Sequence, residues 1–284
     1  MTRSPAAPLR VLQLCSRDCV GGVQVLTQLI GTSLDRHGVE VDDIALISEG
    51  GIGSRLAHLG RVAGRLLFGR YDAVLSYQPA ASVVMGTLGV LGGVKLRISH
   101  LTSMPDAIRG VWRLPDRLVG GLGGYTAIIA NSSATEHAFS AAYPAAYRRR
   151  MRLIPHGVAP LLPPSGAVDW RARLGIPADA TVLVATGRLT DQKDHATAIR
   201  ALPLLPGAHL AIAGDGPERA TMVSLARQLG VAGRLHLAGS VARGDLADFL
   251  AMGDVYLFPS VWETFGLAGV EAQMAGLPVV AADL

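Results

Sequence analysis

Short apolar runs alternate with longer segments of helical period along the whole chain. Each run has the length of a buried strand, and most are followed by a glycine-containing loop and a helix-like segment. This alternation predicts a doubly wound, parallel α/β fold. In the first half, the expected strands are residues 10–14, 41–47, 72–77, 95–99, 126–130 and 152–155, and the expected helices include 23–36 and 51–68. In the second half, the expected strands are residues 181–186, 209–213, 235–238, 255–258 and 278–281.

A proline-rich segment divides the two series of strands. Residues 157–166 read G-V-A-P-L-L-P-P-S-G, a composition that prevents helix formation and favours extended chain. We therefore expect two domains, residues 1–160 and residues 161–284. Each resembles a Rossmann unit, and in such sheets ligands bind at the carboxyl ends of the strands. A cleft between the two domains is the expected place for a substrate.

The last thirty residues have the most informative pattern: V-Y-L-F-P-S-V-W-E-T-F-G-L-A-G-V-E-A-Q-M-A-G-L-P-V-V-A-A-D-L. Glu263 is expected in a loop and Glu271 one to two turns into the following helix. The N–H groups of Phe265, Gly266 and Leu267 should then point out of the helix N-terminus, which favours an anion. Carboxylates beside them suit sugar hydroxyls, although a surface acid beside a helix terminus is the alternative interpretation.

This segment resembles the donor-binding motif of retaining glycosyltransferases of family 4 (group 1). P-S, E-x-F-G-L, E-A and G-x-P-V-V occur in order, and the acids match the E-x7-E pattern. The resemblance covers nearly the whole chain, strongly from about residue 128 onward. It implies the GT-B fold, in which two Rossmann-like doubly wound domains face a cleft. It also implies a hexosyltransferase-type enzyme that moves a sugar from a nucleotide-diphosphate sugar to an acceptor hydroxyl.

A second motif, V-A-T-G-R-L-T-D-Q-K-D, follows the first strand of the second half. Gly187 allows a tight turn, and Arg188 and Lys193 can converge on one diphosphate from the end of that strand. Arginine offers a planar fork and lysine a point charge. The resemblance gives this pair the donor pyrophosphate and the leaving nucleoside diphosphate. Taken alone, G-R-x4-K is equally consistent with an exposed ion pair.

Three further glycine-containing loops could approach a ligand. Residues 213–217 (A-G-D-G-P) form a strand-to-loop turn, and residues 239–241 follow the next strand, where the family's backbone often contacts the base. Gly21 and Gly22 follow the first strand, and paired glycines permit close approach of a substrate. The resemblance assigns that loop to donor phosphate or acceptor, whereas a tight βα turn explains it equally well.

Two histidines end strands of the first half. His100 closes K-L-R-I-S-H, where similar enzymes direct a histidine toward the transferred sugar. His156, in I-P-H-G-V, stands where many relatives have asparagine, and we expect a structural role for it. The expected catalytic set is therefore His100, Arg188, Lys193 and Glu263. The expected donor-binding set is Gly187, Arg188, Lys193, Glu263, Phe265, Gly266, Leu267 and Glu271.

Composition and charge narrow the remaining choices. The net charge is +4, with an arginine cluster at residues 148–152 that could attract nucleotide phosphates or an anionic membrane face. The two cysteines, in C-S-R-D-C, complete no zinc set, and a reducing cytoplasm is the simplest context. No run of ~18 apolar residues or signal-like start is present. We expect peripheral membrane contact at most, no nucleic-acid partner, no cofactor beyond the donor substrate and, without a D-x-D pair, no essential metal.

Two alternatives compete with an active transferase. The chain ends just after the fifth strand of the second half, where relatives continue, so we expect the second domain to be incomplete. A folded but inactive relative that binds a nucleotide sugar or a partner protein is therefore the main alternative. A sugar-nucleotide epimerase of the same fold is disfavoured by the E-x-F-G-L and E-A motifs.

Overall fold

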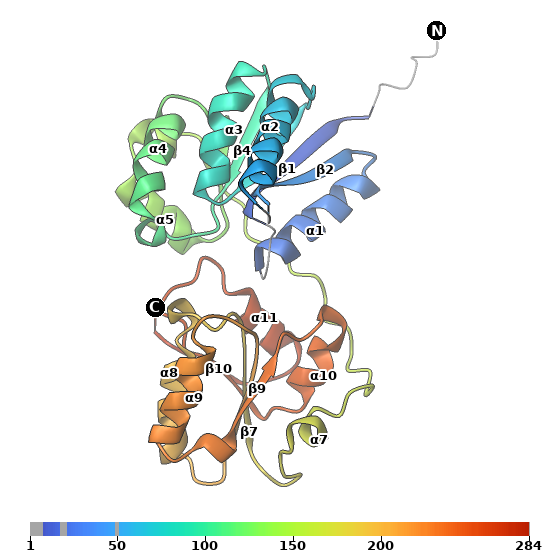
Figure 1. Cartoon of the computed structure of the whole chain (residues 1–284), viewed down its shortest axis with the longest axis vertical. Coiled ribbons are helices and arrows are strands. Elements are labelled where there is room, and N and C mark those ends of the chain that lie inside the picture. Colours follow the sequence, from blue (N-terminus) through green and yellow to red (C-terminus); the bar gives the residue numbers. More distant parts are fainter. Residues whose placement is uncertain (1–7, 18–21, 49–50, 284) are drawn as a thin grey trace. The chain divides into compact units, whose positions relative to one another are not determined.

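The computed structural model describes residues 8–17, 22–48 and 51–283. The chain divides into two compact units, Met1–Gly157 and Val158–Leu284, whereas the sequence placed the boundary at 160/161. Each unit contains one parallel sheet, six-stranded in the first and five-stranded in the second (Figure 1). All the strands expected from the sequence are present, so the predicted doubly wound α/β class is confirmed.

The first unit has the strand order β2-β1-β3-β4-β5-β6. Its strands are β1 (Arg10–Arg17), β2 (Glu40–Ile47), β3 (Ala73–Tyr77), β4 (Leu96–His100), β5 (Ala127–Ala130) and β6 (Met151–Leu153). Its helices are α1 (Gly22–Arg36), α2 (Ile52–Phe68), α3 (Pro79–Leu91), η1 (Pro105–Ala107), α4 (Gly110–Gly121), α5 (Ser133–Ala142) and α6 (Ala145–Arg148).

Alternate residues of β1 show how the layers form. Leu12 and Leu14 point to one face of the sheet, where they share a core with Leu66 of α2 and Met85 of α3. Cys15 points to the other face and packs with Leu26 of α1. Successive strand residues point to opposite faces, so α2 and α3 cover one face and α1 covers the other. Figure 1 shows α3 between α2 and α4.

The N-cap of helix α5 is one residue too early in the sequence for a capping box with Glu136. Ser132 is the N-cap, and its hydroxyl accepts a hydrogen bond from the Thr135 N–H at 3.1 Å. Thr135 therefore occupies the third helical position, and Glu136 lies one residue beyond it. Glu136 is therefore one residue too far along the helix to complete a capping box with Ser132.

The second unit has the strand order β11-β10-β7-β8-β9. Its strands are β7 (Val182–Thr186), β8 (His209–Ala213), β9 (Leu235–Gly239), β10 (Val255–Phe258) and β11 (Val279–Ala281). Its helices are α7 (Trp170–Leu174), η2 (Asp191–Lys193), α8 (His195–Ala201), η3 (Leu202–Leu204), α9 (Arg219–Gln228), η4 (Ala232–Arg234), η5 (Arg243–Asp245), α10 (Leu246–Ala251) and α11 (Leu267–Met274).

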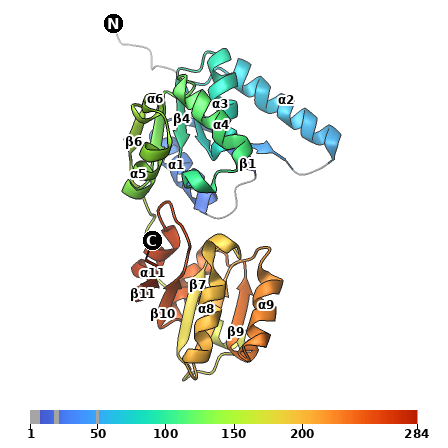
Figure 2. The same cartoon turned by 90° about the vertical axis from the view of Figure 1, so that its left-hand side faces the viewer.

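Two apolar clusters sandwich this second sheet. Leu183 and Ile212 pack on the side of α8 and α9, whereas Val184 packs on the side of α7, α10 and α11. Figure 2 shows α8 and α9 together on their side of the sheet. The consequence for function is that the loops after β7, β8, β9 and β10 all emerge at one edge of the sheet.

The end of the proline-rich segment is fixed to the second unit. The carboxylate of Asp248 in α10 accepts hydrogen bonds from the Ser165 hydroxyl at 2.7 Å and the Gly166 N–H at 2.9 Å. These bonds hold the pKa of Asp248 below its usual range. Trp170 then packs edge-on against Phe249, with ring centroids 5.4 Å apart. Residues 165–170 therefore belong to the packed structure of the second unit.

No helix in the described part of the chain is both long and apolar enough to cross a bilayer. Cys15 is not a free thiol in the structure.

Candidate functional site

The loops after β7 and β8 meet backbone to backbone. The Gly187 N–H donates to the Ala213 carbonyl at 2.9 Å, and the Leu189 N–H donates to the Asp215 carbonyl at 3.0 Å. A Cβ on Gly214, whose φ is +153°, would lie 1.8 Å from the Gly187 oxygen, and one on Gly216 would lie 2.4 Å from the Leu189 oxygen. The A-G-D-G-P turn is therefore more than a simple β-turn, because only glycine permits this close approach.

Lys193 and Glu263 form an ion pair that joins the loops after β7 and β10. Lys193 Nζ lies 2.5 Å from Glu263 Oε1, and the two side chains are only 17% and 15% exposed. Lys193 Nζ also lies 5.5 Å from the centre of the Phe258 ring, within the range of a cation–π contact. The main chain reinforces the junction, since the Val261 N–H donates to the Gln192 carbonyl at 2.8 Å.

Arg243 and Glu271 form a second ion pair at the same edge. Glu271 is the fifth residue of α11 and is buried, whereas Arg243 comes from η5, after β9. The expected placement of Glu263 in the loop and Glu271 in the helix is confirmed. Sequence reasoning missed Arg243, because it belongs to no motif and lies 28 residues from its partner.

Helix α11 begins at Leu267, directly after Gly266, whose φ is +82°. The first N–H groups of an α-helix lack intrahelical acceptors, so those of Leu267 and Ala268 are available at this end. A Cβ on Gly266 would lie 3.2 Å from the Phe258 ring. Gly266 therefore provides both the turn and the fit that bring the helix terminus close to Lys193 and Glu263.

Arg188 differs from the other cations of this edge. Arg188 is exposed, and no carboxylate in the described part of the chain forms an ion pair with it. Beneath it, the Tyr256 hydroxyl lies 2.8 Å from Thr186 Oγ1 and fixes the end of β7. Burial raises the pKa of Tyr256 to about 12, so it stays a neutral hydrogen-bonding group.

His195, at the start of α8, is a further titratable group near the ion pair. It is buried, and desolvation together with the charge of Lys193 lowers its pKa to about 4. Its ring is therefore neutral at ordinary pH and adds no positive charge beside Lys193. The sequence offered no signal for it, because a lone histidine after a lysine is a common surface pattern.

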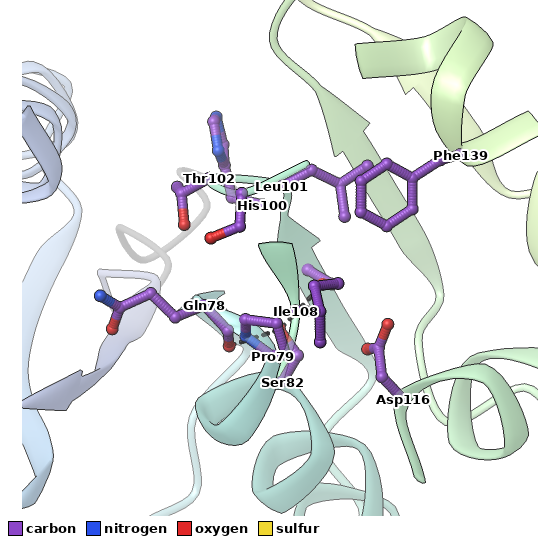
Figure 3. Close-up of a pocket in the computed structure, with 11 residues that line it drawn as sticks. Gln78, Pro79, Ser82, His100, Leu101, Thr102, Ile108, Asp116 and Phe139 are labelled. Carbon is purple, nitrogen blue, oxygen red and sulfur yellow. Dashed lines mark hydrogen bonds between the residues drawn. The ribbon is translucent and has the colours of Figure 1, made fainter. Parts of the chain in front are cut away.

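In the first unit, His100 ends β4 and lines a small pocket with Gln78, Ser82 and Asp116 (Figure 3). The His100 ring stacks on His156 with centroids 5.1 Å apart, and its Nδ1 has no hydrogen-bond partner among the described residues. Burial and the neighbouring His156 lower the pKa of His100 to about 3. His100 is therefore a neutral imidazole with an unused polar atom.

The other expected residues are placed as follows. His156 Nε2 lies 2.9 Å from Asn131 Nδ2. Gly22 is the first residue of α1, whereas Gly21 lies outside the described residues. Gly239 has a φ of +74°, and its carbonyl accepts from the Gly214 N–H at 2.7 Å. No group of three or more metal-ligating side chains occurs in residues 8–17, 22–48 and 51–283.

Comparison with known proteins assigns the second unit to a family. The family model described as glycosyl transferases group 1 matches residues 168–284. Residues 168–284 are therefore similar to a group 1 glycosyl transferase domain. The chain is 43% identical over 114 residues to the lipopolysaccharide core biosynthesis glycosyltransferase LpsE of Rhizobium meliloti (strain 1021). It is 38% identical over 118 residues to the D-inositol 3-phosphate glycosyltransferase of Mycobacterium bovis (strain BCG / Pasteur 1173P2).

The matches to these two relatives cover 40% and 39% of this chain, and 33% and 24% of the relatives. The chain thus matches about a third or less of the length of these curated proteins.

Solved structures resemble the whole chain. Anabaena HepE, in complex with UDP and glucose, has a TM-score of 0.80 at 22% identity, covering 97% of this chain and 81% of that one. The lipopolysaccharide-biosynthesis glycosyltransferase WaaG has a TM-score of 0.70 at 20% identity, covering 95% and 80%. The two units and their parallel sheets therefore have the GT-B fold, as the sequence predicted.

We expect Gly214→Ala to disrupt the junction of the β7 and β8 loops in the group 1 domain. The added Cβ would overlap the Gly187 carbonyl at an unfavourable φ, so the free energy of unfolding should fall by about 3 kcal/mol or more. Gly207→Ala is the matched control, because Gly207 has a φ of +79° but open space around it. Its cost should stay near 1–2 kcal/mol, roughly that of backbone strain alone. Equal losses in urea unfolding would contradict the steric argument.

We expect His100 to make stability depend on pH. Its folded pKa is lowered to about 3, against about 6.5 in the unfolded chain. The unfolded state therefore binds the proton first, and stability present above pH 6.5 is lost as the pH falls toward 3. The loss is at most about 1.4 kcal/mol per pH unit.

Comparing the wild type with His100→Gln by urea unfolding between pH 7 and pH 4 isolates this contribution. Burial raises the pKa of Asp116 to about 6, which gives the opposite pH dependence, but Asp116 is common to both proteins and cancels in the difference. Superimposable pH profiles for the two proteins would show that His100 is not buried as a neutral group.

Proposed function

We propose that this protein is a retaining hexosyltransferase of family 4 that moves a sugar from a nucleotide-diphosphate sugar to an acceptor hydroxyl. The observation that carries the proposal is the gathering of two ion pairs, Lys193 with Glu263 and Arg243 with Glu271, and a helix N-terminus at one edge of the second sheet. The group 1 domain over residues 168–284 supports it. HepE was solved with UDP-glucose, which makes a UDP-sugar the first donor to test.

The positively charged groups of the site can bind the diphosphate of the donor. We assign Arg188 and Lys193 to the diphosphate oxygens, together with the N–H groups at the start of α11, including Leu267. In the transfer, the bond between the sugar's anomeric carbon and the diphosphate oxygen breaks, and its electron pair leaves with the diphosphate. Preorganised positive charge stabilises that developing anion, which is commonly a large part of catalysis.

The carboxylates suit the hydroxyl groups of the donor. We assign Glu263, beside Phe265 and Gly266, to the sugar and Glu271 to the ribose. Each ion pair uses Oε1 of its carboxylate, and we assign each Oε2 to a donor hydroxyl. Arg243 then acts as a positioning residue, because it holds the Glu271 carboxylate in one orientation.

We assign the binding of the acceptor to the first unit. We assign His100 a hydrogen bond to the transferred sugar or to the acceptor, because its neutral ring can donate or accept. The acceptor oxygen attacks the anomeric carbon from the face that the diphosphate leaves, which retains configuration. The proton of the acceptor hydroxyl passes to the departing diphosphate. We propose no resident metal, since Arg188 and Lys193 supply the charge, and peripheral contact of the protein with an anionic membrane.

One nucleoside diphosphate should stabilise the protein against heat. At one hundred times its dissociation constant, a ligand adds about 2.7 kcal/mol, which raises the melting temperature by roughly 2–4 °C in a protein of this size. We would measure melting with UDP, GDP and ADP in the wild type and in Glu271→Gln, which removes the carboxylate but keeps its shape. The variant should lose most of the shift. A cooperative wild-type melt that no nucleotide shifts would contradict the proposed donor site.

Lys193→Ala should lower the rate of transfer while leaving the protein folded. Removing one preorganised donor from a developing oxyanion costs about 10²–10³-fold in kcat. The measurement is release of nucleoside diphosphate from the matching nucleotide sugar, with water or a supplied acceptor. Arg227→Ala, an exposed arginine at the end of α9, is the control and should keep wild-type turnover.

Turnover at the wild-type rate in folded Lys193→Ala would remove this residue from the mechanism. Nucleotide binding by the wild type without any release of diphosphate from nucleotide sugars would favour the inactive, nucleotide-sugar-binding alternative.

A further inference from the structure

Three neighbouring strands of the first sheet lead into polar side chains at the same edge. His100 is the last residue of β4, Asn131 directly follows β5, and His156 lies three residues beyond the end of β6. The sheet order places β4, β5 and β6 side by side. The Ile154 N–H donates to the Ala130 carbonyl at 2.9 Å, so the chain stays beside β5 past the end of β6 and brings His156 next to Asn131.

The ring of His100 is buried, but hydrogen bonding at Nδ1 does not orient it. His100 is 7% exposed, and its Nδ1 has no partner in the part of the chain that the structure describes. Figure 3 shows the ring pointing away from Ile108 and Asp116, which line the same pocket. Rotation of an imidazole about its last side-chain bond has a broad energy profile, so the plane of this ring depends on its neighbours.

Two aromatic rings supply that restraint. The Tyr77 ring lies 5.7 Å from the His100 ring, between centroids, at an angle of 36°. Tyr77 is fully buried, and its hydroxyl donates to Gln13 Oε1. The His156 ring lies 5.1 Å from the His100 ring and is tilted by only 7°, within the range of favourable aromatic pairs. His156 therefore sets the plane in which the His100 ring lies.

His156 is itself held by hydrogen bonds that start at helix α5. The Ser132 hydroxyl donates to Thr135 Oγ1 at 3.0 Å, and the Thr135 hydroxyl donates to Asn131 Oδ1 at 3.0 Å. Asn131 Nδ2 then lies 2.9 Å from His156 Nε2. Asn131 and Thr135 are fully buried, and Ser132 is the N-cap of α5. The imidazole of His156 is thus tied to a fixed helix terminus.

The direction of these hydrogen bonds defines the protonation state of His156. An amide oxygen only accepts, and an amide nitrogen only donates. Because Asn131 Oδ1 accepts from Thr135, Asn131 Nδ2 donates to His156 Nε2, which must carry a lone pair. Burial also lowers the pKa of His156. His156 is therefore a neutral ring with its proton on Nδ1.

We propose, on the basis of the function proposed above, that His156 is a positioning residue for sugar transfer. It fixes the plane of the His100 ring, and thereby the direction of the hydrogen bond that His100 makes to the transferred sugar or the acceptor. Hydrogen bonds weaken steeply when they are misaligned, and a ring that can turn spends less time in the productive geometry. The sequence predicted a structural role for His156, and its contact with His100 gives that role a consequence for the reaction.

A double-mutant cycle on turnover tests whether His156 acts through His100. The assay is release of nucleoside diphosphate from UDP-glucose, or from the glucose nucleotide whose nucleoside diphosphate stabilises the protein. His100→Ala should lower kcat about ten-fold, roughly the cost of losing one neutral hydrogen bond. His156→Ala should lower it about five-fold, because the His100 ring remains but is no longer held.

The double variant decides between a positioning role and an independent effect. If His156 acts only through His100, His100→Ala with His156→Ala should turn over at the rate of His100→Ala alone. Independent effects would multiply to a loss of about fifty-fold. The nucleotide-dependent rise in melting temperature should be unchanged in all three variants, because the residues assigned to the donor nucleotide belong to the second unit.

Nitrogen-15 NMR of the histidine rings gives a readout that does not require turnover. Signals of His100 and His156 are identified by their loss in the two single variants. We expect the proton of neutral His156 on Nδ1. The pKa of His100, lowered by burial and by His156, should rise toward about 6.5 in His156→Ala.

Two further variants control for folding and for the loss of any histidine. His156→Gln removes the ring but keeps an amide that can accept from Asn131, so it should stay folded if His156→Ala does not, and it should be equally non-additive with His100→Ala. His137→Ala changes an exposed histidine of α5 in the same unit. It should keep wild-type turnover and leave the pKa of His100 unchanged.

Two results would overturn the proposal. One is multiplicative loss in the double variant, and the other is a His100 pKa that is the same in the wild type and in the folded His156 variants. A wild type that releases no diphosphate from any nucleotide sugar would instead remove the proposed function. The NMR titration would still decide, in that case, whether His156 restrains His100.

Discussion

The ion pair between Lys193 and Glu263 is the interaction on which the candidate site depends. It joins the loop after β7 to the loop after β10, across 70 residues of sequence. Both partners are largely buried, and their mutual attraction offsets part of the cost of taking each charge out of water. The pair also keeps the start of α11 beside the end of β7, which brings Arg188 and the helix N-terminus to one edge of the sheet.

Much of the fold could be predicted because strand and loop signals are local. Apolar runs marked every strand, and the spacing of Glu263 and Glu271 placed one acid in a loop and the other in a helix. The partners of these acids could not be predicted in the same way. Arg243 reaches Glu271 only in the folded domain, across 28 residues of sequence, and no spacing rule encodes that contact.

In helix α4, the pattern of apolar residues would lead to a wrong prediction of which side is buried. Its leucines have the period of a core-facing stripe, so pattern alone would bury them and expose Asp116. The structure reverses this because Tyr125 gives the Asp116 carboxylate a buried hydrogen-bond partner and Tyr147 occupies the space beside Gly120. This hydrogen bond and this packing together override the hydrophobic period and leave the leucines of α4 exposed.

The pairing of charges also bears on how the proposed donor would enter. Without ligand, each carboxylate of the site is neutralised by a cation of the same unit, while Arg188 is exposed. A diphosphate carries more negative charge than one carboxylate, so it can attract Lys193 as well as Arg188. As Lys193 turns toward the phosphate, Glu263 loses part of its partner and gains hydrogen-bonding capacity for a sugar hydroxyl. Phosphate binding and sugar binding are thereby coupled through one ion pair.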